Sequence, residues 1–215
     1  MQIFDRLRTV LTRDNITRCA LYGFLPALVF YLVALFVMRQ AGFSYVEILR
    51  DPAQQTEQSS FLGFLSSVGT WFWVSAAAIS FFRVLSDAPA EAAHRTVLWM
   101  IAGFSLFLGV DDFFLIHDRY ITEGILIPVY IVFLWVLLKR YNGVVMGTDG
   151  TAFFMAGGLL AFSVVVDAVQ EILPIGYGAS QVLEEGGKFT GAAVWMFFCA
   201  RVAAYRGAPL QSGSR

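Results

Sequence analysis

The feature that most constrains the fold is an apolar run from Phe61 to Phe82 that contains no charged residue. A helix needs about 20 apolar residues to cross the hydrocarbon core of a bilayer, where the backbone finds no water to bond. This run and an earlier one, from Cys19 to Met38, are both long enough to do so. The chain is therefore expected to be an integral membrane protein.

Further apolar stretches extend this expectation to a helical bundle. They are shorter, and they cover Thr96–Val110, Ile125–Leu138, Thr151–Val166 and Phe189–Ala200. The chain is 58% hydrophobic and only 14% charged, which is outside the range of ordinary soluble domains. The connections are short, so we predict one all-α, polytopic membrane bundle of about six transmembrane helices over residues 19–205. A cytoplasmic interfacial segment (1–18) and a disordered cytoplasmic tail (206–215) are expected to flank it.

The distribution of Lys and Arg predicts the orientation of the bundle, because cytoplasmic loops carry an excess of both. With the N-terminus inside, the inner segments hold eleven such residues: Arg6, Arg8, Arg13, Arg18, Arg83, Arg95, Lys139, Arg140, Arg201, Arg206 and Arg215. The outer segments hold three, Arg39, Arg50 and Arg119. We therefore expect both termini in the cytoplasm and a multi-pass protein of the bacterial inner (plasma) membrane. The net charge of -1 gives no basic face for nucleic acid.

Charged residues gather where three of the predicted spans reach the outer side. The third span carries Asp111, Asp112, His117 and Asp118, the fifth carries Asp167 and Glu171, and the sixth carries Glu184, Glu185 and Lys188. If each of these short stretches is extended to the roughly 20 residues of a full span, Asp111, Asp112 and Asp167 lie within the membrane. At about 100° per residue, His117 lies about 120° around the helix from Asp111, so it joins a common site only if the helix end unwinds or the ring swings in.

The charge of this region predicts a bound counter-charge. With Glu123 included, eight acidic residues face Arg119 and Lys188, which leaves an excess of six negative charges at one membrane level. Protonation, water in an open cavity or a bound cation would have to neutralise them. The sharpest of these hypotheses is a divalent metal held by Asp111, Asp112, Asp167 and Glu184. Oxygen ligands favour Ca, Mg or Mn, and one added imidazole would allow Fe or Zn.

Several residues have structural alternatives. Asp118, Glu123 and Glu171 are expected to be solvated, and Glu184 with Lys188 has the spacing of an ordinary helical ion pair. His94 is predicted to be a surface histidine in an inner loop. Cys19 and Cys199 are expected to pack as small residues without a disulfide. The Gly187–Gly191 spacing predicts close packing of the fifth and sixth helices.

The Asp-Asp…His-Asp sequence of residues 108–118 and the Glu-Glu-x-x-Lys sequence of residues 183–195 resemble those of an uncharacterised group of bacterial multi-span membrane proteins. The resemblance covers about the second half of the chain and implies no activity. A fainter similarity is to the membrane metal-hydrolase superfamily that includes the alkaline ceramidases, which implies a zinc site. The chain departs from that superfamily in its six expected spans and in offering His117 alone where three zinc-binding histidines are needed.

Three functions are compatible with these observations. The first is a metal-dependent hydrolase acting on a lipid or lipid-linked substrate, in which Glu185 or His117 serves as general base. The second is an ion or proton pathway through the same carboxylates. The third is a non-catalytic subunit or assembly factor of a membrane complex, whose partners would be other membrane subunits as well as membrane lipids. Fold and depth alone do not choose among them.

Overall fold

The computed structural model describes residues 12–50, 52–59, 61–89 and 91–206, and in these ranges every regular element is a helix. The predicted all-α class is therefore confirmed. The chain divides into two compact units, Met1–Leu62 and Gly63–Arg215, which are described separately. Most of the predicted interfacial segment and nearly all of the predicted tail lie outside the described residues.

The first unit is built around the first of the long apolar runs. It contains α2 (Arg13–Cys19), the π-helical turn η1 (Ala20–Phe24) and α3 (Leu25–Gln40), followed by the short helices α4 (Tyr45–Leu49) and α5 (Pro52–Gln55). Pro26 lies in the first turn of α3, where its missing N–H costs least. Ser44 and Glu47 form a reciprocal capping box that starts α4. No residue of α3 is buried, so its apolar side chains face outward along the whole helix.

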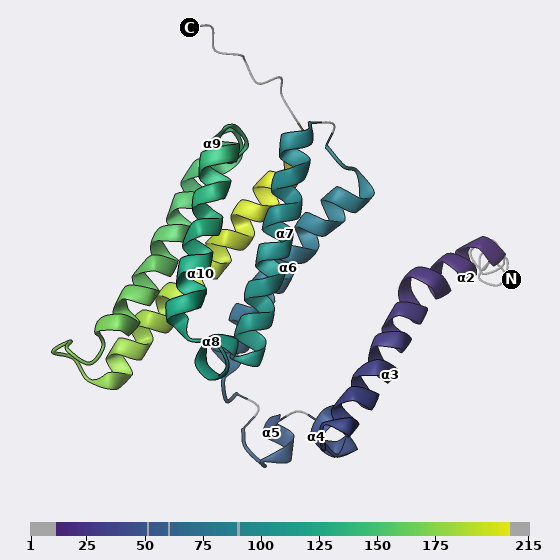
Figure 1. Cartoon of the computed structure of the whole chain (residues 1–215), viewed down its shortest axis with the longest axis horizontal. Coiled ribbons are helices and arrows are strands. Elements are labelled where there is room, and N and C mark those ends of the chain that lie inside the picture. Colours follow the sequence, from purple (N-terminus) through teal and green to yellow (C-terminus); the bar gives the residue numbers. More distant parts are fainter. Residues whose placement is uncertain (1–11, 51, 60, 90, 207–215) are drawn as a thin grey trace, which may run out of the picture. The chain divides into compact units, whose positions relative to one another are not determined.

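The second unit is a bundle of long helices (Figure 1). It contains α6 (Phe64–Ser86), α7 (Ala92–Phe114), α8 (Ile116–Arg119), α9 (Glu123–Val169) and α10 (Tyr177–Ala204). The backbone of α9 leaves the helical range at Tyr141 and at Asp149. Figure 1 shows that α9 folds back there into two arms that run side by side. The fourth and fifth apolar stretches of the sequence are the two arms of this one element.

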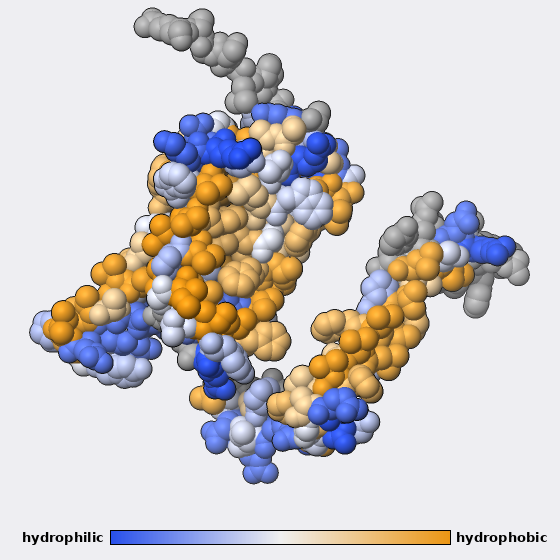
Figure 2. Space-filling model, viewed as in Figure 1, coloured by the Kyte–Doolittle hydropathy of each residue, from blue (hydrophilic) through white to orange (hydrophobic). Residues whose placement is uncertain are grey.

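Three of these helices are long and apolar enough to cross a membrane: Phe64–Ser86, Ala92–Phe114 and Gly124–Val169. Their outward faces are largely hydrophobic, and Figure 2 shows an apolar belt on the bundle with hydrophilic residues at its two ends. An apolar surface of this extent is stable in lipid and unstable in water. The chain is accordingly a helical membrane protein.

The core of the bundle lies between α6, α7, α9 and α10. Leu98, Ile101, Trp195 and Phe198 are at most 1% exposed, and the rings of Phe104, Phe153 and Phe198 pack around the Trp195 indole. This layer fills the middle of the bundle with apolar side chains, and the charged residues described below lie toward one end of it.

Two glycines set the distance between α9 and α10. A Cβ on Gly187 would lie 2.9 Å from Phe162 Cδ1 and 3.2 Å from the Leu159 carbonyl oxygen. A Cβ on Gly191 would lie 2.8 Å from Leu160 Cγ. Real Cβ atoms do not approach this closely, so only glycine permits this packing. The close approach of these helices that the sequence predicts is confirmed.

Candidate active site

Two adjacent aspartates at the end of α7 form the centre of the site. Asp111 and Asp112 are only 5% and 7% exposed, although they lie in a helix of membrane-spanning length. Successive residues of a helix point about 100° apart, so the two carboxylates face different neighbours. Each carboxylate therefore has its own set of partners.

Asp112 faces α6 and α10. The Thr70 hydroxyl donates a hydrogen bond of 2.6 Å to Asp112 Oδ2, and the Lys188 ammonium lies 2.7 Å from Asp112 Oδ1. Thr70 can reach Asp112 because α6 and α7 pack closely at Gly109. A Cβ on Gly109 would lie 3.3 Å from Trp73 Cβ. Asp112 of α7 is thus paired with Lys188 of α10 and accepts a hydrogen bond from Thr70 of α6. A buried carboxylate needs such a counter-charge.

Asp111 faces α8 and the first arm of α9. The Tyr130 hydroxyl donates a hydrogen bond of 2.7 Å to Asp111 Oδ2. The backbone N–H of His117 donates to Asp111 Oδ1 at 2.9 Å, and His117 Nδ1 lies 3.1 Å from the same oxygen. The carboxylate therefore holds the backbone N–H of His117 and lies beside its ring.

His117 reaches Asp111 because α7 ends one turn beyond the aspartates. Leu115 adopts a left-handed backbone with φ 53° and ψ 46°, and its N–H bonds to the Asp111 carbonyl. Few residues other than glycine adopt this conformation, so it marks a position that the surrounding structure enforces. The chain then turns into α8 and carries His117 back toward Asp111. The end of α7 is therefore unwound, which is one of the ways in which His117 was expected to join the site.

The other two predicted ligands lie where α9 ends and α10 begins. Gln170 Nε2 donates to Asp167 Oδ1 at 2.7 Å, and Gln181 Nε2 donates to Glu184 Oε2 at 2.7 Å. The two glutamines contact each other at 3.2 Å. Asp167 and Glu184 are thus joined through the two amides.

A cavity of about 10 Å³, roughly the space of one water molecule, lies beside the ion pair of Asp112 and Lys188. Its lining residues are Leu65, Ser66, Gly69, Trp73, Asp112, Glu185, Lys188, Phe189 and Ala192. Glu185 is exposed, so this predicted catalytic residue lies at the edge of the site and on its polar side. The cavity places water-accessible space next to a buried charge pair.

The four predicted metal ligands each bond to other protein groups. Asp111 and Asp112 have separate protein partners, and Asp167 and Glu184 accept hydrogen bonds from glutamines. Among the side chains that the structure describes, which do not include those of Asp118 and Glu123, no group of three or more His, Cys, Asp or Glu is placed to hold a metal ion. The divalent metal stays a prediction of the sequence.

One interpretation from the sequence is corrected. His94 is 3% exposed rather than a surface residue, because α7 begins before it and turns its ring against α10. Its Nε2 lies 2.8 Å from the Val202 carbonyl, and its ring stacks on Tyr205. Lys188 contacts Asp112 across the helix interface, a partner that the sequence did not assign to it.

Four polar partners in this region were not singled out from the sequence: Thr70, Tyr130, Gln170 and Gln181. Thr70 lies within the charge-free run, and Tyr130 lies among the apolar residues of the fourth stretch, so neither stands out by composition. Gln170 and Gln181 flank the acidic positions Asp167 and Glu184 at distances of one helical turn, and this spacing is the signal that would have found them.

Comparison with protein families gives one match. A family model described as a domain of unknown function (DUF8692) matches residues 24–202, which run from the start of α3 to the end of α10. No curated protein and no solved structure matches the chain.

Proposed function

The chain belongs to the family described as a domain of unknown function (DUF8692), and because this membership carries no activity, we propose one from the site itself. The protein is a membrane hydrolase that cleaves an ester or amide bond in a lipid or lipid-linked substrate. His117 is its general base and Asp111 is the residue that orients the base. The observation that carries this proposal is the double contact of Asp111 with His117.

A carboxylate against one ring nitrogen of histidine is the arrangement that prepares the other nitrogen for proton transfer. The contact at Nδ1 favours the tautomer with its proton on Nδ1, which leaves the lone pair on Nε2. The backbone hydrogen bond from His117 to the same oxygen fixes the direction of the ring. The side chain of His117 is 20% exposed, so water can reach it from one end of the bundle. These features support a base role for His117 over Glu185, for which the described residues show no such orienting contact.

The proposed reaction needs a proton acceptor and a positive charge. His117 Nε2 takes a proton from water while the water oxygen bonds to the carbonyl carbon of the substrate. The carbonyl electrons move to oxygen, and the positive charge of Lys188, 29% exposed at the same helix end, stabilises this oxyanion. Collapse of the intermediate breaks the bond to the leaving group, which takes the proton back from His117. No metal enters these steps.

The position of the site favours chemistry at one leaflet over a pathway through the membrane. The layer of Leu98, Ile101 and Trp195 fills the bundle beneath the aspartates and is at most 1% exposed. An ion crossing the bundle would have to pass this dry layer, where an uncompensated charge costs several kcal/mol. A lipid substrate, in contrast, would reach the site from the end at which His117 and Lys188 are partly exposed.

The orientation of the bundle decides which leaflet supplies the substrate. We propose six spans, formed by the helical segment of α2 to α3, by α6, α7 and α10, and by the two arms of α9. Each arm of α9 covers about 27 to 30 Å at 1.5 Å per residue, close to the thickness of a bilayer core. With both termini in the cytoplasm of a bacterial cell, the site lies at the outer leaflet of the inner membrane.

Reporter fusions test this topology. A reporter that is active only in the cytoplasm should be active after residue 145 or residue 215 and silent after residue 120 or residue 178. The expectation rests on the eleven-to-three excess of Lys and Arg in the inner segments. The opposite pattern at residues 145 and 215 would place the candidate site at the inner leaflet.

The hydrolase proposal is tested with the two histidines of the chain. Purified protein in nanodiscs that contain ester-linked and amide-linked lipids is assayed by mass spectrometry for released fatty acid. H117Q and D111N should each lower the rate at least about 100-fold, as loss of a general base does. The matched variant H94Q removes the histidine at the other end of α7 and should keep the wild-type rate.

A second readout separates catalysis from folding. Nitrogen-15 labelling of histidine in H94Q leaves His117 as the one labelled imidazole, and its spectrum reports the tautomer directly. We expect the proton on Nδ1 in H94Q, and a mixture of tautomers when D111N is added. A wild-type protein that releases no fatty acid above empty nanodiscs, or an H117Q variant as active as wild type, would contradict the proposal.

A further inference from the structure

The end of the bundle opposite to the candidate active site carries a surplus of positive charge. Its charged residues in the described part of the chain are Arg83, Arg95, Lys139, Arg140, Arg201 and Arg206, with Asp87, Glu91 and Asp149. Six cations and three carboxylates leave three positive charges uncompensated. The hydrolase proposal makes no use of this end.

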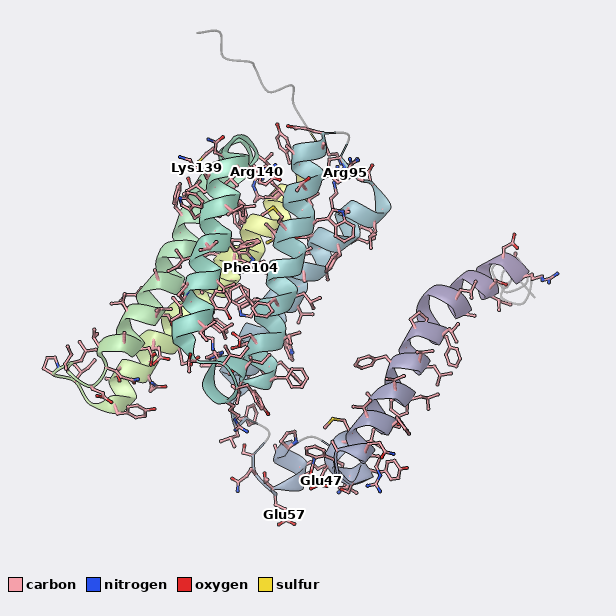
Figure 3. The ribbon with its side chains drawn as sticks, viewed as in Figure 1. Glu47, Glu57, Arg95, Phe104, Lys139 and Arg140 are labelled. Carbon is pink, nitrogen blue, oxygen red and sulfur yellow. The ribbon has the colours of Figure 1, made fainter. Side chains whose placement is uncertain are left out.

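The uncompensated charges belong to identifiable residues. Arg83 and Arg206 both contact Asp87, and Arg201 Nε lies 3.4 Å from Asp149 Oδ2. Three other basic residues are exposed and have no ion pair with any carboxylate among the residues that the structure describes: Arg95, Lys139 and Arg140. The exposed Glu91, one turn before Arg95, is the remaining acid of this end. Figure 3 places Arg95, Lys139 and Arg140 at the same end of the bundle.

Exposed indoles lie one helical turn from two of these cations, on the side toward the middle of the bundle. Trp99 follows Arg95 by four residues in α7 and is 46% exposed. Trp135 precedes Lys139 by four residues in α9 and is 60% exposed. Tryptophan favours the interface between headgroups and acyl chains. Beyond Trp135 on the same arm, Val132 is 58% exposed and continues the apolar surface.

This order of side chains matches the layers of a phospholipid. Apolar residues such as Val132 meet the acyl chains, the indoles meet the glycerol and carbonyl region, and the cations meet the phosphate. A zwitterionic headgroup would bring its own positive charge, which would leave the surplus of this end uncompensated. We propose that Arg95, Lys139 and Arg140 form a binding face for the headgroup of an anionic phospholipid.

Fluorescence quenching of the tryptophans tests the proposal. The full-length protein is reconstituted in phosphatidylcholine vesicles that contain a small fraction of brominated phosphatidylglycerol or, in a parallel sample, the same fraction of brominated phosphatidylcholine. The brominated anionic lipid should quench more strongly. In the variant R95Q/K139Q/R140Q this preference should disappear, since each basic residue near an anionic lipid contributes about fivefold in local binding.

A triple variant on the predicted outer side of the membrane controls for the change in net charge. R39Q/R50Q/R119Q removes the same number of positive charges and should keep the wild-type preference for the anionic lipid. Equal quenching by both lipids in the wild-type protein, or equal loss of preference in both triple variants, would overturn the proposal. So would abolition of the preference by inorganic phosphate at matched ionic strength, because the ligand would then be a soluble anion. Persistence of the preference in phosphate supports the lipid.

Discussion

Replacing Lys188 by methionine should lower the free energy of unfolding by about 3 to 5 kcal/mol, because it leaves a buried carboxylate without its counter-charge. Methionine keeps most of the volume of the lysine stem, so the packing of α10 against α6 and α7 changes little. Asp112, which is 7% exposed, would then keep the hydrogen bond from the Thr70 hydroxyl but lose the positive charge beside it. The desolvated charge, rather than a cavity, is the source of the loss.

A double-mutant cycle isolates this effect. D112N removes the charge that K188M strands, so the double variant D112N/K188M should recover most of the stability lost in K188M alone. K139M is the matched control, since it changes the other lysine of the chain, which is exposed and has no ion pair with a described residue. It should change the unfolding free energy by less than about 0.5 kcal/mol. Unfolding in mixed micelles with rising dodecyl sulfate measures the wild-type protein and the four variants.

The same variant tests the cation that the sequence predicts. If the carboxylates of this region hold a divalent metal, added Ca²⁺, Mg²⁺, Mn²⁺ or Zn²⁺ should restore part of the stability of K188M, because binding to the folded state shifts the equilibrium. From the paired geometry of Asp112 with Lys188, we expect no rescue by any of these ions. Rescue by one of them would reinstate the metal site, and a K188M variant as stable as wild type would contradict the ion-pair argument.

The part of the fold that could be predicted from the sequence is the part that the lipid environment determines. Long apolar runs such as Phe61–Phe82 have one stable solution in a bilayer, which is a helix, and the all-α class follows from them. The close packing at Gly187 and Gly191 was also predictable, because small residues spaced by one turn are the signature of helices in contact. The number of spans rests on the apolar runs and their orientation on the loop charges, and both remain predictions.

The charged residues of the site could be predicted from the sequence, but their pairings and their uncharged partners could not. An aspartate at membrane depth has to find a partner, so Asp111 and Asp112 could be identified from their position alone. Which partner each one finds depends on the rotation of α7 against its neighbours and on the left-handed residue Leu115, which is not a glycine and gives no signal in the sequence. The contact of Lys188 with Asp112 could not be predicted, because helical spacing describes contacts within a helix, whereas this contact crosses an interface.

His94 shows the same limit at the other end of α7. Its neighbours Glu91 and Arg95 are charged and exposed, which predicts a surface loop. The helix instead begins at Ala92, and the ring of His94 turns inward to the Val202 carbonyl, one of the last carbonyls of α10 that have no partner within the helix. A sequence window around His94 holds no information about the end of α10, so this contact could not be anticipated.

Replacing Trp195 by alanine should destabilise the protein by about 3 to 5 kcal/mol, the range of large aromatic residues truncated in a packed core. Trp195 is 1% exposed, its ring contacts those of Phe104, Phe153 and Phe198, and its Nε1 donates a hydrogen bond of 2.9 Å to Ser105 Oγ. In a membrane the unfolded helices remain in an apolar environment, so the loss comes from the cavity and from lost van der Waals contacts rather than from exposure to water.

The matched control for this variant is Trp71→Ala in α6. Trp71 is 65% exposed, so its removal leaves no internal cavity and should change the unfolding free energy by less than about 0.5 kcal/mol. W195F separates the two contributions of Trp195, because it refills most of the volume but cannot donate to Ser105, and it should fall between wild type and W195A. Unfolding in mixed micelles gives the three values. Equal changes in unfolding free energy for W195A and W71A would mean that the layer of Trp195 does not hold α7, α9 and α10 together. This layer could then not be taken to close the bundle beneath the candidate site.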